Sequence, residues 1–555
     1  MKVFAALAHS LAKDHGVTTV FGLLGAGTMM IVDELAHRHD AQLIRVVRED
    51  GAILGAMGWQ HSTGAPIGVA AVGAGPALTN AFTALVEASR NHTPMIVLAD
   101  DRWEDRGNVQ GINQETVVPP TGAAYVEIQS PETAVDDLRR AVELALSEQR
   151  PVVVDLPTSI VMSDIDDELA PVAPIEPAPR VPLSGIDEAV ALIEASSKPF
   201  VLAGWGAFLA DARHELETLA EQLGAPVATT MKAKSFFAGS PFALGTFGGF
   251  SSRMTKEVIG EADLVLAFGA GLNLWTADHG ALLKGKTVIQ IDTVPGNMNY
   301  TFDVTANVVG DVREVAKAFS DRLKDAPGFP KAFRSEELRE RIAAFDPGAA
   351  RYTSEHASGT VDLHEFVAAL EKIKPKGSNV VTDGGRYVVA PMSYLTVEHP
   401  RHWLAPIGGF GSIGLAMGAS MGIAVARPEA PTFLVVGDGA FMMTLYELNT
   451  AVRNSLDLII VVMNDRAYSS EYHWYLASES EDKQLAADQL TKFDWPEFEG
   501  LAKSLGYNAL TVTSMDDMER VAEGITNRTR PLLIDVRLDP EALAGFHDAS
   551  EPAPE

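Results

Sequence analysis

The chain has 555 residues, and its 46% hydrophobic and 21% charged residues are typical of a globular protein of about three to four domains. It contains no cysteine, which excludes disulfides, thiolate metal sites and a cysteine nucleophile. Its formal net charge of −30 argues against nucleic acids and anionic membranes as partners. Met1–Ala8 lacks the pattern of a secretory signal and no apolar run approaches the length of a membrane span, so we expect a cytoplasmic protein.

Short apolar runs of β type alternate with helical patterns along most of the chain. This alternation predicts an α/β protein of three doubly wound, parallel-sheet domains. The buried strands are predicted at Ile67–Val72, Met95–Ala99, Val152–Asp155, Phe200–Ala203, Leu264–Phe268, Val288–Ile291, Asn379–Thr382, Thr432–Val436, Asp457–Met463 and Leu532–Val536.

Two stretches divide the chain into these domains. Ala170–Pro182 carries five prolines, and Lys324–Gly359 is charged, bounded by turn residues and predicted to be mostly helical. We therefore expect domains at 1–168, 183–325 and 359–545, with a linker at 326–358 and an acidic tail at 546–555.

The first and last domains end in similar segments. Arg150–Asp155 and Arg530–Asp535 both read Arg-Pro, a short apolar run and Asp. This faint internal repeat predicts that the first and third domains share a fold and that the middle domain differs.

The most informative motif is Gly437-Asp438-Gly439-Ala440, which links the strand Thr432–Val436 to a predicted helix, Phe441–Arg453. The next strand ends at Asn464-Asp465. In a right-handed strand–helix–strand unit both loops lie at one edge of the sheet, so Asp438 and Asp465 are predicted to share a crevice. Carboxylate oxygens suit Mg²⁺, whose remaining ligands are often phosphate oxygens, and free amides at a helix start bind phosphate. The unit therefore predicts a diphosphate–Mg²⁺ site.

This pair of motifs resembles that of the thiamine diphosphate-dependent enzymes, and three further segments match the family in register. The resemblance extends over essentially the whole chain and is closest to the acetolactate synthase branch, with local likeness to benzaldehyde lyase. It implies thiamine diphosphate and Mg²⁺ as cofactors. The implied metal ligands are Asp438, Asp465 and Ala467, and the implied contacts to the diphosphate end of the cofactor are Gly385, Arg386, Tyr387, Asp438, Gly439, Ala440, Asp465, Ala467 and Tyr468. A generic strand-to-helix turn explains Tyr387 equally well.

Glu49 follows the largely apolar run Leu43–Val47 and precedes a predicted small-residue helix, Gly51–Trp59. By resemblance it is the glutamate that promotes the imino tautomer of the cofactor's aminopyrimidine, which then removes the proton of the thiazolium carbon. The alternative is an acid that stabilises a helix start. Gly73–Asn80 fits the family's glycine-rich helix start, with Pro76 at the first helical position.

The loop Pro406–Gly414 matches the segment that meets the pyrimidine ring in this family. There Gly411 would accept a hydrogen bond, and Ile413 would donate one and hold the two cofactor rings in a V. The Gly-x-Gly-x-x-Gly pattern of Gly409–Gly414 does not sit directly after a strand, which disfavours a dinucleotide site. Gly280–Thr287 fits a P-loop letter by letter but runs into a strand instead of a helix, so it is also set aside.

The substrate side is predicted from the same resemblance. The implied pocket residues are Leu24, Gly25, Ala26, Gln114 and Trp474, with Gln114 the polar group that reaches the reacting carbonyl. Core packing is the alternative for Trp474. Gly73 stands where benzoylformate decarboxylase has a histidine, and a pocket poor in acid–base groups favours carboligation over protonation. Flavin adenine dinucleotide stays open, because Phe268–Gly271 lacks the arginine that accompanies flavin in the synthases, and Gly204–Gly206 is only a fragment of a dinucleotide loop.

The predicted activity is decarboxylation of a 2-oxo acid and ligation of the acyl group to a second carbonyl. Cleavage of an acyloin or 1,2-diketone by the same cofactor is the alternative, and a non-catalytic cofactor-binding homologue is disfavoured by the retained Glu49, Asp438 and Asp465. Because family members combine the glutamate and the metal-binding aspartate from different subunits, the resemblance implies a homodimer with sites at its interface, or a tetramer.

Overall fold

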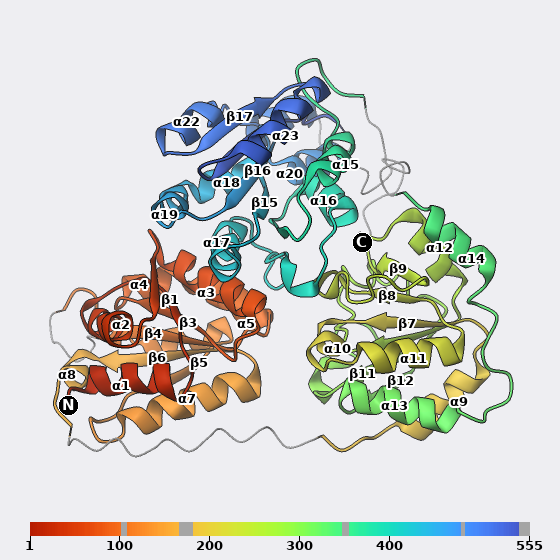
Figure 1. The fold of residues 1–555 in the computed structure, drawn as a ribbon, viewed down its shortest axis with the longest axis horizontal. Coiled ribbons are helices and arrows are strands. Elements are labelled where there is room, and N and C mark those ends of the chain that lie inside the picture. The colour runs from red at the N-terminus through yellow and green to blue at the C-terminus, as the bar shows by residue number, and fades with distance from the viewer. Residues whose placement is uncertain (102–107, 166–180, 347–354, 479–482, 543–555) are drawn as a thin grey trace.

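The computed structural model describes residues 1–101, 108–165, 181–346, 355–478 and 483–542. It contains three six-stranded sheets, each made of parallel strands and covered by helices, as the alternation of strands and helices predicts (Figure 1). Within the described ranges, no helix combines the length and apolar character that crossing a bilayer requires.

The first sheet has the order β2-β1-β3-β4-β6-β5. Its strands are β1 (Thr19–Leu23), β2 (Gln42–Arg45), β3 (Gly68–Val72), β4 (Met95–Asp101), β5 (Ala124–Glu127) and β6 (Pro151–Pro157). Its helices are α1 (Val3–Lys13), α2 (Ala26–Arg38), α3 (Glu49–Thr63), α4 (Pro76–Asn80), α5 (Phe82–Arg90), α6 (Gln114–Val117), α7 (Ala134–Glu148) and α8 (Thr158–Val161). Pro76 is the first residue of α4, as predicted.

The third sheet repeats this topology with the order β14-β13-β15-β16-β18-β17, which confirms the fold shared by the first and third domains. Its strands are β13 (Asn379–Thr382), β14 (Trp403–Leu404), β15 (Thr432–Gly437), β16 (Leu458–Asn464), β17 (Asn508–Val512) and β18 (Leu532–Arg537). Its helices are α15 (Leu363–Ile373), α16 (Val389–Tyr394), α17 (Ala416–Ala426), α18 (Asp438–Met443), α19 (Leu448–Arg453), α20 (Ser469–Ala477), α21 (Lys483–Thr491), α22 (Phe498–Ser504) and α23 (Met518–Asn527).

The middle sheet has a different order, β12-β11-β10-β7-β8-β9, which is the doubly wound order of dinucleotide-binding folds. Its strands are β7 (Pro199–Ala203), β8 (Val227–Thr229), β9 (Ala243–Thr246), β10 (Leu264–Phe268), β11 (Thr287–Asp292) and β12 (Ala306–Val309). Its helices are α9 (Ile186–Ala195), α10 (Trp205–Leu209), α11 (Arg213–Leu223), α12 (Arg253–Glu261) and α13 (Val312–Leu323). Gly280–Thr287 leads into β11, which confirms that it is not a P-loop.

Two helix predictions need correction. The segment predicted as one helix, Phe441–Arg453, is split into α18, a short 3₁₀ turn and α19, because the Thr444 hydroxyl donates to the Ala440 carbonyl at 3.1 Å and closes α18. Lys324–Gly359 is not mostly helical: in its described part only α14 (Glu336–Ala344) is an α-helix. Pro327, Gly328 and Pro330 break the preceding stretch. Most of the proline-rich linker at 170–182, and the tail at 546–555, lie outside the described residues.

The first and third domains share one hydrophobic core through α3 and α17 (Figure 1). Glycines let the two backbones approach closely. A Cβ atom on Gly58 would overlap the carbonyl oxygen of Ala419, and one on Gly422 would overlap the carbonyl oxygen of Gly55. Glu49 begins α3, and the loop carrying Ile413 precedes α17. The close contact of these two helices, called the glycine seam below, therefore joins the elements that carry two predicted site segments.

The middle domain joins the others through His61 at the C-terminal part of α3. Its imidazole stacks on Trp205 with ring centroids 4.8 Å apart, and its Nε2 lies 2.9 Å from the carbonyl oxygen of Trp403. Burial lowers the pKa of His61 to about 3, so the ring is neutral and donates its N–H to this carbonyl. One side chain therefore contacts the other two domains.

Candidate functional site

Asp438 and Asp465 follow neighbouring strands of the third sheet. β15 and β16 are paired in parallel with Gly437 opposite Met463, so the two aspartates emerge at the same sheet edge, as predicted. Asp438 is the first residue of α18 and only 3% exposed. Its carboxylate accepts hydrogen bonds from the Gly439 amide at 2.8 Å and from the Trp495 indole at 3.0 Å.

Asp465 is oriented by its own loop. Its Oδ1 accepts from the Ala467 amide at 3.0 Å, and its Oδ2 accepts from the Ser469 hydroxyl. Burial and the nearby charge of Asp465 raise the pKa of Asp438 well above its ordinary value, and burial also raises that of Asp465. Two carboxylates that destabilise each other's ionised form are arranged to receive a cation.

The donor set fits a hard cation that also takes ligands from a bound group. Among the described residues, no cluster of three or more His, Asp or Glu side chains could hold a metal alone. Two carboxylates leave most positions of an octahedral Mg²⁺ for a backbone carbonyl, water and phosphate oxygens. This is the ligand set that a Mg²⁺–diphosphate complex requires.

Arg386 provides a cationic group beside this pair. It lies in the turn after β13, and its Nε is buried without a hydrogen-bond partner in the described structure. Burial lowers its pKa, while the charge of Asp465 acts in the opposite direction. An unsatisfied buried guanidinium N–H fits an anionic ligand such as a diphosphate.

Gly385, Tyr387 and Gly439, three further predicted contacts to the cofactor, differ in their backbone conformation and in their contacts within the protein. Gly385 has a φ of +137°, which a residue with a side chain rarely adopts. The Tyr387 hydroxyl donates to the Val435 carbonyl at 3.2 Å, so this contact supports the sheet. The contact agrees with the alternative that Tyr387 belongs to an ordinary strand-to-helix turn. A Cβ atom on Gly439 would overlap the Tyr468 ring, which shows why the motif needs glycine there.

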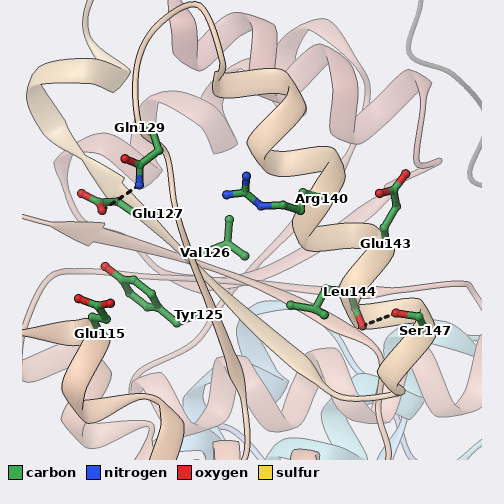
Figure 2. Close-up of a pocket in the computed structure, with 9 residues that line it drawn as sticks. All are labelled: Glu115, Tyr125, Val126, Glu127, Gln129, Arg140, Glu143, Leu144 and Ser147. Carbon is green, nitrogen blue, oxygen red and sulfur yellow. Dashed lines mark hydrogen bonds between the residues drawn. The ribbon is translucent and has the colours of Figure 1, made fainter.

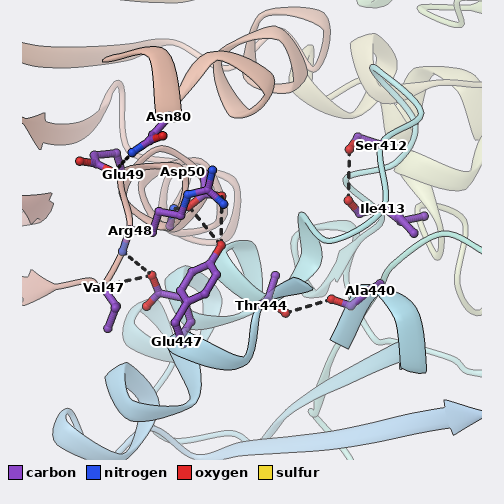
Figure 3. A network of polar contacts seen from close by, with 12 residues as sticks. Val47, Arg48, Glu49, Asp50, Asn80, Ser412, Ile413, Ala440, Thr444 and Glu447 are labelled. Atoms are coloured by element: carbon purple, nitrogen blue, oxygen red, sulfur yellow. Dashed lines mark hydrogen bonds and ion pairs between the residues drawn. The ribbon is translucent and has the colours of Figure 1, made fainter. Parts of the chain in front are cut away.

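The loop Pro406–Gly414 is fixed by Asp383, a role that the sequence did not indicate. The buried Asp383 carboxylate accepts from the amides of Gly414 at 3.1 Å and Ala416 at 2.9 Å. Gly411 and Gly414 have φ of +82° and +84°, so the loop turns sharply on both sides of Ile413. The Ser412 hydroxyl donates to the Ile413 carbonyl at 3.1 Å (Figure 3).

Glu49 begins α3 and is 8% exposed, so both its predicted roles, site acid and helix-start acid, suit its position. The Asn80 side chain donates to its Oε2 at 3.1 Å. Figure 3 shows Glu49 well separated from Ile413 of the same chain. Within one chain the predicted activating acid therefore does not meet the predicted cofactor loop.

A third-domain carboxylate holds the segment that presents Glu49. Glu447 accepts from the amides of Val47 at 3.1 Å and Arg48 at 3.0 Å (Figure 3). The break between α18 and α19 turns Glu447 toward this segment. The sequence predicted an unbroken helix here and did not identify Glu447.

The predicted substrate loop and Gln114 meet through Asp100. The Asp100 carboxylate accepts from the amides of Gly27 at 3.1 Å and Thr28 at 2.6 Å, which caps α2 directly after Leu24, Gly25 and Ala26. Gln114 is 3% exposed, and its amide nitrogen donates to the Asp100 carbonyl at 2.8 Å and to Asp155 at 3.2 Å. Its donors are thus used inside the domain, and its buried Oε1 has no partner in the described part of the chain.

Trp474 on α20 is 69% exposed, which rules out core packing as its role in this chain.

In the middle domain, Gly204 and Gly206 pack against the backbone of Gly269, so the loops after β7 and β10 touch where a dinucleotide would enter.

A surface depression of about 540 Å³ lies elsewhere, between β5 and α7 (Figure 2). Its walls carry three glutamates and one arginine, and it is lined by Glu115, Tyr125, Val126, Glu127, Gln129, Arg140, Glu143, Leu144 and Ser147. None of the predicted site residues lines it, so it is distinct from the candidate site.

Three family models match successive parts of the chain. They describe the N-terminal thiamine pyrophosphate-binding domain over residues 1–117, the central domain over 186–319 and the C-terminal thiamine pyrophosphate-binding domain over 383–536 of thiamine pyrophosphate enzymes. These segments contain the three sheets described above, except that β5 and β6 follow the first match and β13 directly precedes the third.

Relatives of known name match along nearly the whole chain. A sulfoacetaldehyde acetyltransferase of Alcaligenes xylosoxydans xylosoxydans is 27% identical over 91% of this chain and 87% of its own length. A probable acetolactate synthase large subunit of Methanocaldococcus jannaschii is 27% identical over 98% of this chain and 93% of its own. The acetolactate synthase isozyme 3 large subunit of Escherichia coli is 26% identical over 95% and 93%.

Proposed function

The chain belongs to the thiamine pyrophosphate enzymes, in their acetolactate synthase-like branch, and from this premise we propose that it decarboxylates a 2-oxo acid and joins the remaining acyl carbon to a second carbonyl. The observation that carries the proposal is the pair of the buried Asp438 and the half-buried Asp465 beside the unpartnered Arg386 Nε. When bound, thiamine diphosphate supplies an electron sink for the charge left on the carbonyl carbon when a carbon–carbon bond breaks.

The residues of the chain divide the remaining tasks. Asp438, Asp465 and the Ala467 carbonyl would hold Mg²⁺, and Arg386 with the amides of Gly439 and Ala440 would hold the diphosphate. These groups orient the cofactor and neutralise its charge.

At the other end, the loop residues Gly411 and Ile413 would position the pyrimidine ring. Glu49, with its Oε2 oriented by Asn80, would share a proton with a ring nitrogen. Because Glu49 and Ile413 are separated within one chain, we propose a homodimer, or a tetramer built from it, in which Glu49 of one subunit serves the loop of the other.

The predicted pocket supports ligation over simple decarboxylation. Leu24, Gly25, Ala26 and Trp474 carry no acid–base group, and the amide donors of Gln114 are used by Asp100 and Asp155. A site without a nearby proton donor protonates an acyl carbanion slowly, which leaves time for attack on a second carbonyl. Two of the relatives named above are acetolactate synthases, in agreement with this reaction.

Cleavage of an acyloin or 1,2-diketone is the second candidate. It is favoured by the buried, unpartnered Oε1 of Gln114, which could accept from a substrate hydroxyl. The sulfoacetaldehyde acetyltransferases among the relatives make sulfoacetaldehyde a further substrate to include.

The test loads the protein with Mg²⁺ and thiamine diphosphate and supplies pyruvate, following CO₂ release and acetolactate or acetoin by mass spectrometry. Ligated product together with CO₂ supports the proposal. If pyruvate is not consumed while the cofactor is bound, parallel incubations with acetoin, a cyclic 1,2-diketone and sulfoacetaldehyde decide between the remaining reactions.

A further inference from the structure

Helix α5 of the first domain contacts the cofactor loop of the third domain through a buried carboxylate. Glu87 on α5 has no exposed surface. Its Oε1 accepts from the Gly409 amide at 3.2 Å and its Oε2 from the Phe410 amide at 2.7 Å. These two amides directly precede Gly411 in the loop Pro406–Gly414.

Arg90, one turn further along α5, makes a second contact to the same segment. Its Nη1 donates to the Gly409 carbonyl at 3.4 Å, and its guanidinium lies 4.9 Å from the centre of the Phe410 ring. Glu87 therefore binds the backbone amides of Gly409 and Phe410. Arg90 binds the Gly409 carbonyl and the Phe410 ring.

The Glu87 carboxylate is also bound by Asn91, which is contacted from the middle domain. The Asn91 side chain donates to Glu87 Oε1 at 2.8 Å, and the Lys232 ammonium donates to the Asn91 backbone carbonyl at 2.7 Å. Lys232 in turn lies 5.1 Å from the centre of the Trp205 ring. The network thus connects all three domains to the loop.

The other end of the loop is held by Asp383 through the Gly414 and Ala416 amides. Gly411, Ser412 and Ile413 lie between these two anchors, and the Gly411 amide donates to the Ile407 carbonyl of the same loop at 3.0 Å. A short segment fixed at both ends by buried carboxylates has little freedom, and such support places backbone atoms precisely against a ligand.

We propose that Glu87, supported by Arg90 and Asn91, is a positioning residue that fixes Gly411 and Ile413 where the cofactor's pyrimidine ring binds. This inference rests on the proposed function, because it assigns a purpose to a loop that the cofactor would contact. Glu87 does not touch the reacting atoms. It acts through the loop.

The charge of Glu87 gives the arrangement a pH dependence. Burial raises the pKa of Glu87 to about 7, partly offset by the loop amides and by Lys232, while the charge of Asp383 raises it further. Arg90 on α5 binds the Gly409 carbonyl of the same loop. The ionised carboxylate accepts from both loop amides, whereas protonation occupies one oxygen, so the loop is held more firmly as pH rises through about 7.

The test measures amide hydrogen exchange of the peptide covering 406–414 in the full-length protein without cofactor. Glu87→Gln replaces one acceptor by an NH₂ group that faces a loop N–H, so exchange in this peptide should become about tenfold to a hundredfold faster. The difference from wild type should grow as pH rises through about 7, after correction for intrinsic exchange. The control is Glu519→Gln on the exposed face of α23, which should change nothing in the loop.

A second variant covers the case in which Glu87→Gln does not fold. Arg90 is exposed, so Arg90→Ala spares the core and should accelerate loop exchange about threefold to tenfold. Unchanged loop exchange in both variants overturns the inference, as does an equal acceleration over the whole chain in Arg90→Ala.

The cofactor measurement separates this inference from the proposed function. Titration of thiamine diphosphate with Mg²⁺ should show about tenfold weaker binding in Glu87→Gln than in wild type. If wild type does not bind the cofactor, the proposed function fails, while the exchange result still decides whether Glu87 holds the loop. Normal cofactor affinity in Glu87→Gln with faster loop exchange rejects the positioning role.

Discussion

The indole nitrogen of Trp495 lies 3.0 Å from Oδ2 of Asp438 and donates a hydrogen bond to it. Trp495 stacks on Phe493 with ring centroids 4.6 Å apart, so the indole is held in place from its other face. The contact orients the carboxylate that is expected to bind the metal. Groups that orient metal ligands in this way are often nearly as important as the ligands.

Trp495→Phe tests this contact. The variant keeps the stacked ring but loses the donor to Asp438, so we expect Mg²⁺ in the presence of thiamine diphosphate to bind about tenfold to a hundredfold more weakly. Calorimetric titration with Mg²⁺ measures the change. Trp474→Phe on the exposed face of α20 is the control and should leave the affinity unchanged. Unaltered Mg²⁺ affinity in Trp495→Phe would mean that Asp438 needs no such support.

The aspartate pair Asp438 and Asp465 predicts how the stability of the metal-free protein depends on pH. Asp438 and Asp465 both have a folded-state pKa above the unfolded value of about 4, so the folded state holds their protons more strongly. The stability that the two groups contribute to the folded protein is present at low pH. It is lost as pH rises from about 4 toward their raised folded-state pKa values. Thermal unfolding without metal should therefore show a Tm that falls over this range by more in wild type than in Asp438→Asn.

Metal and cofactor should reverse this loss. A cation between the two carboxylates favours their ionised form, so Mg²⁺ with thiamine diphosphate should raise the Tm of wild type most at the upper end of the pH range. A Tm gain that is independent of pH, or equal in Asp438→Asn, would contradict the assignment of this pair to the metal.

Glu49→Gln tests the activating acid. The amide keeps the size of the side chain but cannot take up or release a proton, so kcat should fall about 10²- to 10⁴-fold with little change in cofactor affinity. Steady-state turnover and cofactor titration provide the two measurements. Glu519→Gln serves as the matched control. Turnover that survives the substitution would remove Glu49 from the proposed mechanism.

The separation of Glu49 from Ile413 in one chain predicts complementation between inactive subunits. Glu49→Gln and Asp438→Asn should each be inactive alone. If a site takes Glu49 from one subunit and Asp438 from another, a mixed dimer contains one intact site, and refolding the two variants together should restore activity. Sites built within a single chain would show no recovery, whatever the oligomeric state measured by light scattering.

The glycine seam between α3 and α17 predicts an unusual effect of alanine. In an open helix, Gly→Ala is stabilising by about 0.5–1 kcal/mol, and Gly500→Ala on exposed α22, where a Cβ atom would meet nothing within 4 Å, should behave in this way. In Gly422→Ala the Cβ atom would overlap the Gly55 carbonyl, which is backbone and cannot move aside. We expect a loss of about 1–3 kcal/mol in the free energy of unfolding by urea. A stabilised Gly422→Ala would show that the two helices are not in this contact.

Much of the fold follows from local sequence signals. The predicted strands Leu264–Phe268 and Asn379–Thr382 coincide with β10 and β13, because continuous apolar runs bounded by turn residues encode buried parallel strands locally. The repeated Arg-Pro segments anticipated the shared topology of the first and third sheets. Asp438 and Asp465 were located because each is the residue that follows a strand.

The residues that organise the site carried no such signal. Glu447 binds the segment before Glu49 from 400 residues away, and Glu87 binds Gly409 from 322 residues away. Trp495 lies 57 residues from Asp438. Each of these looks like an ordinary helix or loop residue in the sequence.

The sequence by itself therefore determined the three parallel-sheet domains, the buried strands with continuous apolar runs and the two aspartates, because strand ends and glycine turns are set by neighbouring residues. Only the tertiary structure decided which carboxylates hold the cofactor loop and the Glu49 segment, and that α3 and α17 meet through glycines. These contacts depend on how separate domains pack, and the free energy of a buried hydrogen bond or a close helix crossing exists only after that packing has brought the partners together.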